Sequence, residues 1–158
     1  MIQLAFKIAA KTGSKWSEMI AKASNSPYSH VEMWLDGVSS AARCFSSREP
    51  VGAAFMVLDL TTPEWEITPY SVLGRDEVIQ AFCNGANGKS YDMAGLLGYK
   101  LGNGLHDDHD VFCSEVVSEC LQECAGLVLP KAPWMTSPGD LYNLVTAMYN
   151  LVTAKGAA

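Results

Sequence analysis

Basic residues are too few in this sequence for binding along a phosphate backbone. The chain has 11 lysines and arginines against 17 aspartates and glutamates, which gives a formal net charge of −6. Proteins that neutralise phosphates need a basic stripe or patch on their surface. We therefore expect no nucleic-acid partner.

Long apolar runs are also lacking. No segment approaches the roughly 18 consecutive apolar residues that a membrane-spanning helix needs. The apolar stretch at residues 2–9 contains Lys7 and follows no charged segment, which is not the pattern of a secretory signal peptide. The sequence thus predicts a protein without a membrane span, cytoplasmic as synthesised, which would need another route to leave a cell.

Dense cysteine pairs and linker segments are missing as well. The five cysteines are an odd number spread from position 44 to position 124, whereas a small secreted scaffold carries a dense, even set. We therefore expect reduced thiols. Hydrophobic residues make up 49% of the chain, enough for one core, and we expect a single domain over residues 1–158.

The segments that are present alternate between strand-like and helix-like patterns. Strands are predicted at 2–9, 28–35, 41–46 and 53–60, and helices at 14–23, 75–83, 91–101, 113–124 and from Pro138 onward. Ser14 and Ser137 are suitable N-caps. The similar runs at 143–149 and 150–154 indicate a last helix docked on the core. We expect an α+β fold with a central antiparallel sheet of about four to six strands and helices packed on it.

Cys113 begins one of these predicted helices, directly after a polar loop. Backbone N–H groups and the dipole at a helix N-terminus favour the thiolate and would lower the pKa of this thiol below about 8.5. The same N–H groups can donate to an oxyanion. The alternative role is a small buried hydrophobe, which is common for cysteine and which we assign to Cys120 and Cys124.

His30 lies in the predicted strand 28–35. A lone histidine on a strand is more often packed or solvated than catalytic. A thiolate nucleophile, however, needs an imidazole that takes its proton and later protonates the leaving group. We interpret Cys113 as a nucleophile and His30 as its base.

Four segments together resemble the permuted NlpC/P60 hydrolases, a papain-like family that includes the lecithin retinol acyltransferase-like proteins. In this branch the histidine precedes the cysteine, as His30 precedes Cys113. The segments are Ser-Pro-Tyr-Ser-His-Val-Glu at 26–32, Gly-Lys-Ser-Tyr-Asp at 88–92, Cys-Ser-Glu-Val-Val at 113–117 and Ser-Pro-Gly-Asp-Leu-Tyr at 137–142.

The resemblance implies a papain-like permuted NlpC/P60 fold and a cysteine peptidase or amidase without cofactor or metal. Its substrate would be a peptidoglycan peptide or another acyl or amide compound, and the protein would be bacterial or phage-encoded and reach the cell wall by another route. Two alternatives stay open. One is an acyltransferase or thioesterase that acts on lipids or thioesters, and the other is a catalytically inactive structural or binding component of a phage particle.

The family also implies a third polar residue that orients the imidazole. If the hairpin after His30 has a three-residue loop, Ser46 lies opposite His30, and if it has a two-residue turn, Arg43 does. Glu32 shares a strand face with His30 because it follows two residues later. We favour Ser46 as the orienting residue, with Glu32 as the runner-up.

A metal site is the remaining possibility. Residues 106–110 read His-Asp-Asp-His-Asp and contain possible zinc ligands. The segment lies in a predicted loop, so we interpret it as a solvated acidic loop. The four tryptophans, at 16, 34, 65 and 134, are interpreted as parts of the core or of a cleft wall.

Overall fold

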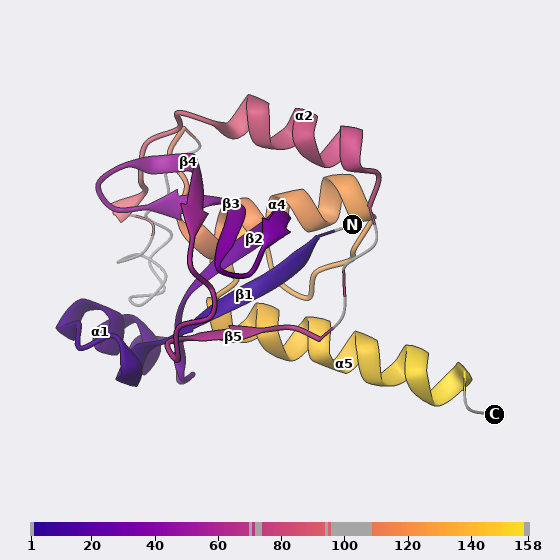
Figure 1. Ribbon diagram of the computed structural model, residues 1–158, viewed down its shortest axis with the longest axis horizontal. Coiled ribbons are helices and arrows are strands. Elements are labelled where there is room, and N and C mark those ends of the chain that lie inside the picture. The colour runs from indigo at the N-terminus through magenta and orange to yellow at the C-terminus, as the bar shows by residue number, and fades with distance from the viewer. Residues whose placement is uncertain (1, 70, 72–73, 94, 96–108, 157–158) are drawn as a thin grey trace.

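A five-stranded antiparallel sheet forms the centre of the described part of the molecule (Figure 1). The computed structural model describes residues 2–69, 71, 74–93, 95 and 109–156. The strand order is β4-β3-β2-β1-β5, and every pairing between neighbouring strands is antiparallel. The strands are β1 (Gln3–Ile8), β2 (Tyr28–Val38), β3 (Ala41–Arg48), β4 (Gly52–Leu58) and β5 (Trp65–Ile67).

Helices cover one face of this sheet, which confirms the predicted α+β class. Figure 1 shows α4 behind the sheet, with α2 above it and α5 below it, and α4 contacts both neighbours as well as β2 and β3. The helices are α1 (Lys15–Ala23), α2 (Asp76–Ala86), α4 (Cys113–Ala125) and α5 (Pro138–Gly156), with short 3-10 turns η1 (Ala9–Lys11) and η2 (Pro133–Met135). Most of the helix predicted at 91–101 lies outside the described residues.

The predicted helix starts are confirmed where their caps can be seen. The Ser14 side chain accepts the N–H of Ser17 at 3.3 Å, and the Ser137 hydroxyl accepts the N–H of Asp140 at 3.1 Å. Each bond satisfies one of the first N–H groups of a helix, which have no partner within the helix itself. These caps fix where α1 and α5 begin.

The main core lies between the sheet and the helices. Strand residues such as Leu4, Phe6 and Met33 are fully buried there against Val116 and Leu121 of α4. A smaller cluster packs on the other face of the sheet, around Ala5, Ala42, Cys44 and Leu60. Because successive strand residues point to opposite faces, β1 and β2 contribute to both clusters.

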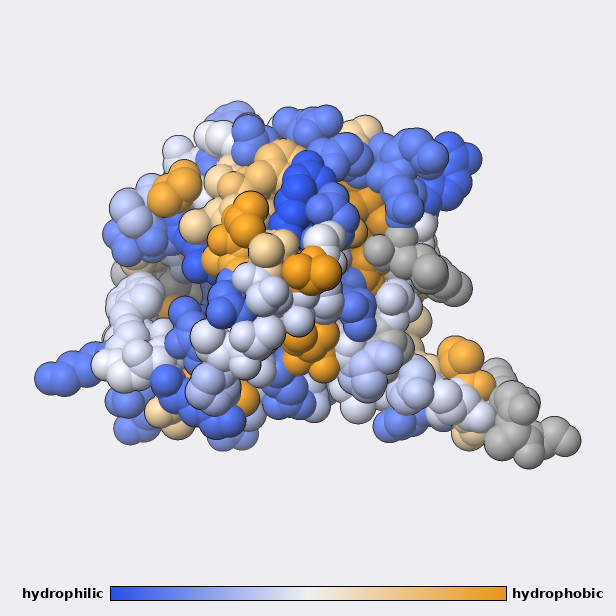
Figure 2. Space-filling view, viewed as in Figure 1, coloured by the Kyte–Doolittle hydropathy of each residue, from blue (hydrophilic) through white to orange (hydrophobic). Residues whose placement is uncertain are grey.

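Only the first half of α5 packs on the core as predicted. Leu141 and Val145 in its first half are buried in the main core, whereas Leu151 and Val152 are 63% and 70% exposed. Figure 2 shows hydrophobic residues at the projecting end of this helix. In the described part of the chain, none of the helices has the length and apolarity of a membrane span.

Both predicted registers of the β2–β3 hairpin are wrong. Val38 pairs with Ala41, so the turn consists of residues 39 and 40, and an irregularity between Trp34 and Asp36 shifts the pairing by one residue. Beyond it Met33 pairs with Phe45, and the same register continued places Arg48 opposite His30. The Asp-Gly pair that resembled a turn instead lies within β2, where Gly37 has a φ of +88°.

Candidate active site

Cys113 is the first residue of α4 and is 4% exposed. The preceding Phe112 has an extended backbone, and its N–H donates to the Glu115 carboxylate at 3.3 Å. This bond from the third helical residue back to the residue before the helix fixes the start of α4. The Cys113 N–H, as the first of the helix, has no acceptor within it. A thiol and a backbone donor therefore stand together at a helix N-terminus.

The His30 imidazole comes from β2 and is held by Glu32. Its Nε2 lies 2.6 Å from the Glu32 Oε1, and the His30 and Glu32 side chains are 15% and 1% exposed. Residues two apart on a strand point to the same face, so the sequence spacing itself creates this contact. Because Nε2 is occupied by the carboxylate, Nδ1 is the nitrogen left for the Cys113 thiol.

Charge around His30 keeps this imidazole protonated. Burial alone would lower its pKa, but the charge of the Cys113 thiolate and a hydrogen bond to it, followed by those of Glu32, outweigh burial and raise the pKa of His30 from 6.5 to about 9. The thiol and the imidazole are therefore within interaction range of each other, although they are 83 positions apart in the sequence. The structure thus brings the candidate nucleophile and the candidate base together.

Arg48 of β3 contacts the same Glu32 carboxylate as His30 does. Its Nε and Nη2 lie 2.7 Å and 2.6 Å from the same Oε1. Burial would raise the pKa of Glu32, but His30 and then Arg48 together lower it. Glu32 is thus a buried carboxylate kept ionised by two cationic neighbours.

Ser46, the residue that we favoured from the sequence, has a different role in the structure. Its hydroxyl donates to the Val31 carbonyl at 2.7 Å, and the side chain is 2% exposed. The observed register, continued, places it opposite Glu32 rather than His30, because the turn lies at residues 39 and 40 and not at 37–39. The structure brings Glu32, the runner-up, to the imidazole.

An indole from β5 forms the wall beside His30. The ring centroids of Trp65 and His30 are 6.3 Å apart in an edge-on arrangement. The Lys7 ammonium and the Arg48 guanidinium lie 5.3 Å and 5.9 Å from the same indole. The sequence did not predict β5, because its three residues give too short an alternation to identify a strand.

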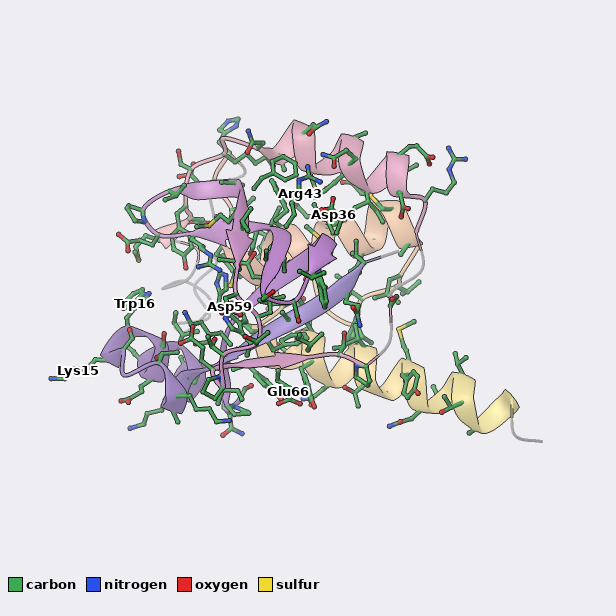
Figure 3. All side chains as sticks on the ribbon, viewed as in Figure 1. Lys15, Trp16, Asp36, Arg43, Asp59 and Glu66 are labelled. Carbon is green, nitrogen blue, oxygen red and sulfur yellow. The ribbon has the colours of Figure 1, made fainter. Side chains whose placement is uncertain are left out.

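A cavity of about 170 Å³ opens beside His30. Figure 3 labels Trp16, which reaches this region from α1. Tyr91 also lines the cavity, and burial followed by the charge of the Cys113 thiolate raises the pKa of its phenol. The phenol therefore stays protonated and can donate a hydrogen bond. The cavity is also lined by Lys7, Ser29, Arg48, Glu49 and Ile20.

The other cysteines differ from Cys113 in their surroundings. All five thiols are free, and Cys124 is the only half-buried one among them. Burial raises the pKa of Cys44 and of Cys83 to about 12, and it also raises that of Cys120. These thiols pack as apolar groups, whereas Cys113 faces an imidazole. Of the two cysteines for which the sequence predicts this role, Cys120 is buried and Cys124 is only half-buried.

The acidic loop weighed as a metal site falls mainly outside the described residues, since His106 and the next two positions are not described. His109 is described and exposed. Among the residues that the structure does describe, no group of three or more histidine, cysteine, aspartate or glutamate side chains could hold a metal ion.

Comparison with known proteins identifies a similar fold but no family. No protein-family model matches the sequence, and no curated protein matches it significantly. Among solved structures, the chain is similar to the metalloprotein yiiX from Escherichia coli O157:H7, with a TM-score of 0.58 and 20% sequence identity over 82% of this chain and 68% of that one. At this identity the likeness concerns the fold alone.

Proposed function

We propose that this protein is a papain-like cysteine hydrolase in which Cys113, His30 and Glu32 act as nucleophile, base and orienting residue. The observation that carries the proposal is the 2.6 Å contact between His30 Nε2 and Glu32, together with the thiol that interacts with the same imidazole. A nucleophile, a base within its reach and a third group that holds the base are what acyl transfer requires.

The roles follow from the positions of the atoms. The Cys113 thiolate attacks an acyl carbonyl carbon, and the developing oxyanion accepts hydrogen bonds from the Cys113 N–H and the Tyr91 hydroxyl. The imidazolium of His30 gives its proton to the leaving group, which departs and leaves a thioester on Cys113. Neutral His30 then takes a proton from water, the hydroxide attacks the thioester, and the acid product and the thiolate–imidazolium pair result.

Glu32 has two tasks in this scheme. Its hydrogen bond fixes the imidazole so that Nδ1 faces the sulfur, and its charge stabilises the imidazolium that every cycle regenerates. Arg48 keeps this carboxylate ionised. A neutral amide at position 32 would lose the second task even if it kept the first.

The family resemblance suggests the class of bond. We place the chain with the permuted NlpC/P60 hydrolases, in which the histidine precedes the cysteine, and this implies a papain-like permuted fold and a peptidoglycan peptide amide as the substrate. The α+β architecture and the antiparallel sheet support that kinship. An acyltransferase or thioesterase would use the same three residues and differ only in the acceptor or the leaving group.

The alternative of a catalytically inactive phage component depends on the lack of a carboxylate or similar group that orients His30. The short contact between Glu32 and His30 removes that reason, so we favour an enzyme.

Trapping of the acyl-enzyme tests the proposal. The protein is incubated with peptidoglycan fragments and, in parallel, with acyl-lipid and thioester substrates, quenched in acid and analysed by intact-mass and peptide mass spectrometry. We expect an acyl adduct on Cys113 and release of product, and neither with Cys113→Ala. If no substrate class leaves an adduct on Cys113 and none is turned over, the proposal fails.

A further inference from the structure

The Ser29 hydroxyl is a buried polar group without a hydrogen-bond partner in the described part of the chain. Ser29 is 3% exposed, and its Oγ makes no hydrogen bond to any described residue. Buried hydroxyls are normally bonded, so one that is not needs an explanation. Ser29 lines the cavity beside His30, and a ligand in that cavity would supply the missing partner.

Lys7 lines the same cavity, and its ammonium group is only loosely held. Its ion pair with Glu64 spans 3.4 Å, longer than the roughly 2.7–2.9 Å of a charge-assisted hydrogen bond. Within the described part of the chain it has no closer polar contact, and its other neighbour is the Trp65 indole. Its side chain is 24% exposed, so the ammonium is partly desolvated. It also has N–H donors that can bind a ligand.

The remaining charges around the cavity do not cancel this cation. Arg48 also lines it, but its short contacts go to Glu32. Glu49 also lines the cavity and is exposed to solvent, which screens its charge. Lys7 therefore remains a loosely paired cation of this cavity, although the chain as a whole has a net charge of −6.

We propose that this cavity binds a carboxylate group of the substrate, with Lys7 Nζ and Ser29 Oγ as the donors. The inference rests on the proposed function and narrows it to acyl compounds that carry a free carboxylate close to the reacting carbonyl. One water occupies about 30 Å³ of liquid, so a cavity of about 170 Å³ accommodates a carboxylate on a short stem. Trp16 and Ile20 of α1 supply apolar wall for that stem.

Two alkylating agents of equal size test this proposal. N-chloroacetylglycine carries a carboxylate, and N-chloroacetylglycinamide carries a neutral amide in its place. With both, the Cys113 sulfur attacks the chloromethyl carbon, a C–S bond forms and chloride leaves. The rate ratio of acid to amide at Cys113, divided by the same ratio for glutathione, measures the preference of the site for a carboxylate.

We expect this normalised ratio to be about tenfold in the wild type, since charge-assisted hydrogen bonds are the strong ones. Lys7→Met should remove most of the preference, and Ser29→Ala should lower it about threefold. Two matched controls should leave it unchanged. Lys11→Met removes the same charge from an exposed position that does not line the cavity. Ser118→Ala removes another buried hydroxyl that has no partner among the residues that the structure describes.

Stability separates a binding role from a structural one. Since the Ser29 hydroxyl has no partner to lose, Ser29→Ala should leave the thermal unfolding midpoint unchanged or raise it while the ratio falls. A ratio that stays at the wild-type value in both Lys7→Met and Ser29→Ala overturns the inference and leaves the proposed function standing. If neither agent labels Cys113 faster than the half-buried Cys124, the proposed function fails and this inference with it.

Discussion

One oxygen of Glu32 receives all three short contacts at this carboxylate. Nε2 of His30 and two nitrogens of Arg48 meet at Oε1, while Oε2 is buried without a partner among the described residues. A carboxylate bound in this way stays charged because two cations offset its desolvation. At the scale of single residues, the protonation state of His30 therefore depends on Glu32 and on the Cys113 sulfur.

The protonation of His30 can be followed directly by NMR. We expect a pKa of about 9 in the wild type and a lower pKa in Cys113→Ala, because the thiolate makes the largest contribution that raises it. Cys83→Ala, which removes a buried thiol of α2, is the control and should leave the titration unchanged. An identical His30 pKa in Cys113→Ala and the wild type would mean that the two side chains do not interact.

The two candidates for the orienting residue predict different losses of activity. Glu32→Gln should lower kcat/KM by a factor on the order of 10²–10⁴, as is typical when the residue that orients a catalytic histidine becomes neutral. Ser46→Ala should cost less than about tenfold, because that hydroxyl binds a backbone carbonyl. Equal losses in both variants, with both folded by circular dichroism, would contradict the assignment of Glu32.

Stability in acid should reveal the same carboxylate. The pKa of Glu32 is lowered from 4.5 in the folded protein, so its contribution to stability is present above pH 4.5 and is lost as the pH falls through its folded pKa. Glu32→Gln should therefore unfold in less urea than the wild type at pH 7, and the difference in free energy of unfolding should shrink toward pH 3. A difference that stays constant or grows in acid would mean that Glu32 is not ionised in the native state.

At the scale of elements, Glu66 of β5 connects the edge of the sheet to α5 through hydrogen bonds. Its two oxygens accept hydrogen bonds from Tyr28 at 2.7 Å and from Tyr142 of α5 at 2.6 Å. The tyrosine rings pack against each other, with centroids 4.4 Å apart. Because β5 also carries Trp65, this contact helps to hold the wall of the candidate active site.

Glu66→Gln should destabilise the protein by about 1–2 kcal/mol, since a hydrogen bond to a charged group contributes about 1.5–3 kcal/mol and an amide still accepts one of the two. The free energy of unfolding in urea measures the loss. Glu64→Gln, which removes the partner of the loose Lys7 pair, is the matched control and should cost less than about 1 kcal/mol. Equal losses would show that Glu66 adds nothing beyond a surface charge.

Local signals explain which elements the sequence predicts. The caps at Ser14 and Ser137, the periodic helix from Cys113 and the alternating strands depend on neighbouring residues, and they match the structure. The register of the β2–β3 hairpin depends on a turn at residues 39 and 40 and on one extra residue at an irregularity, and composition reveals neither of them. The choice between Ser46 and Glu32 as the residue that orients His30 depends on that register. The sequence therefore favours Ser46, whereas the structure places Glu32 at the imidazole.

At the scale of the whole molecule, the site joins segments that are far apart in the chain. The pairing of β1, β2 and β5 brings Lys7 and Trp65 to His30, and β3 contributes Arg48. Cys113 and His30 were recognisable in the sequence because each carries a reactive group in a suggestive local setting. Lys7, Arg48 and Trp65 have no such setting, and only the tertiary pairing gives them a role.

The alkylation of Cys113 by iodoacetamide as a function of pH tests the account most directly, because it needs no substrate. We predict labelling of Cys113 well below the pH at which a free thiol reacts, a loss of this low-pH reaction in His30→Ala, and no native-state labelling of Cys83 and Cys120, which are fully buried. A Cys113 profile that follows glutathione and is the same in His30→Ala would contradict the account.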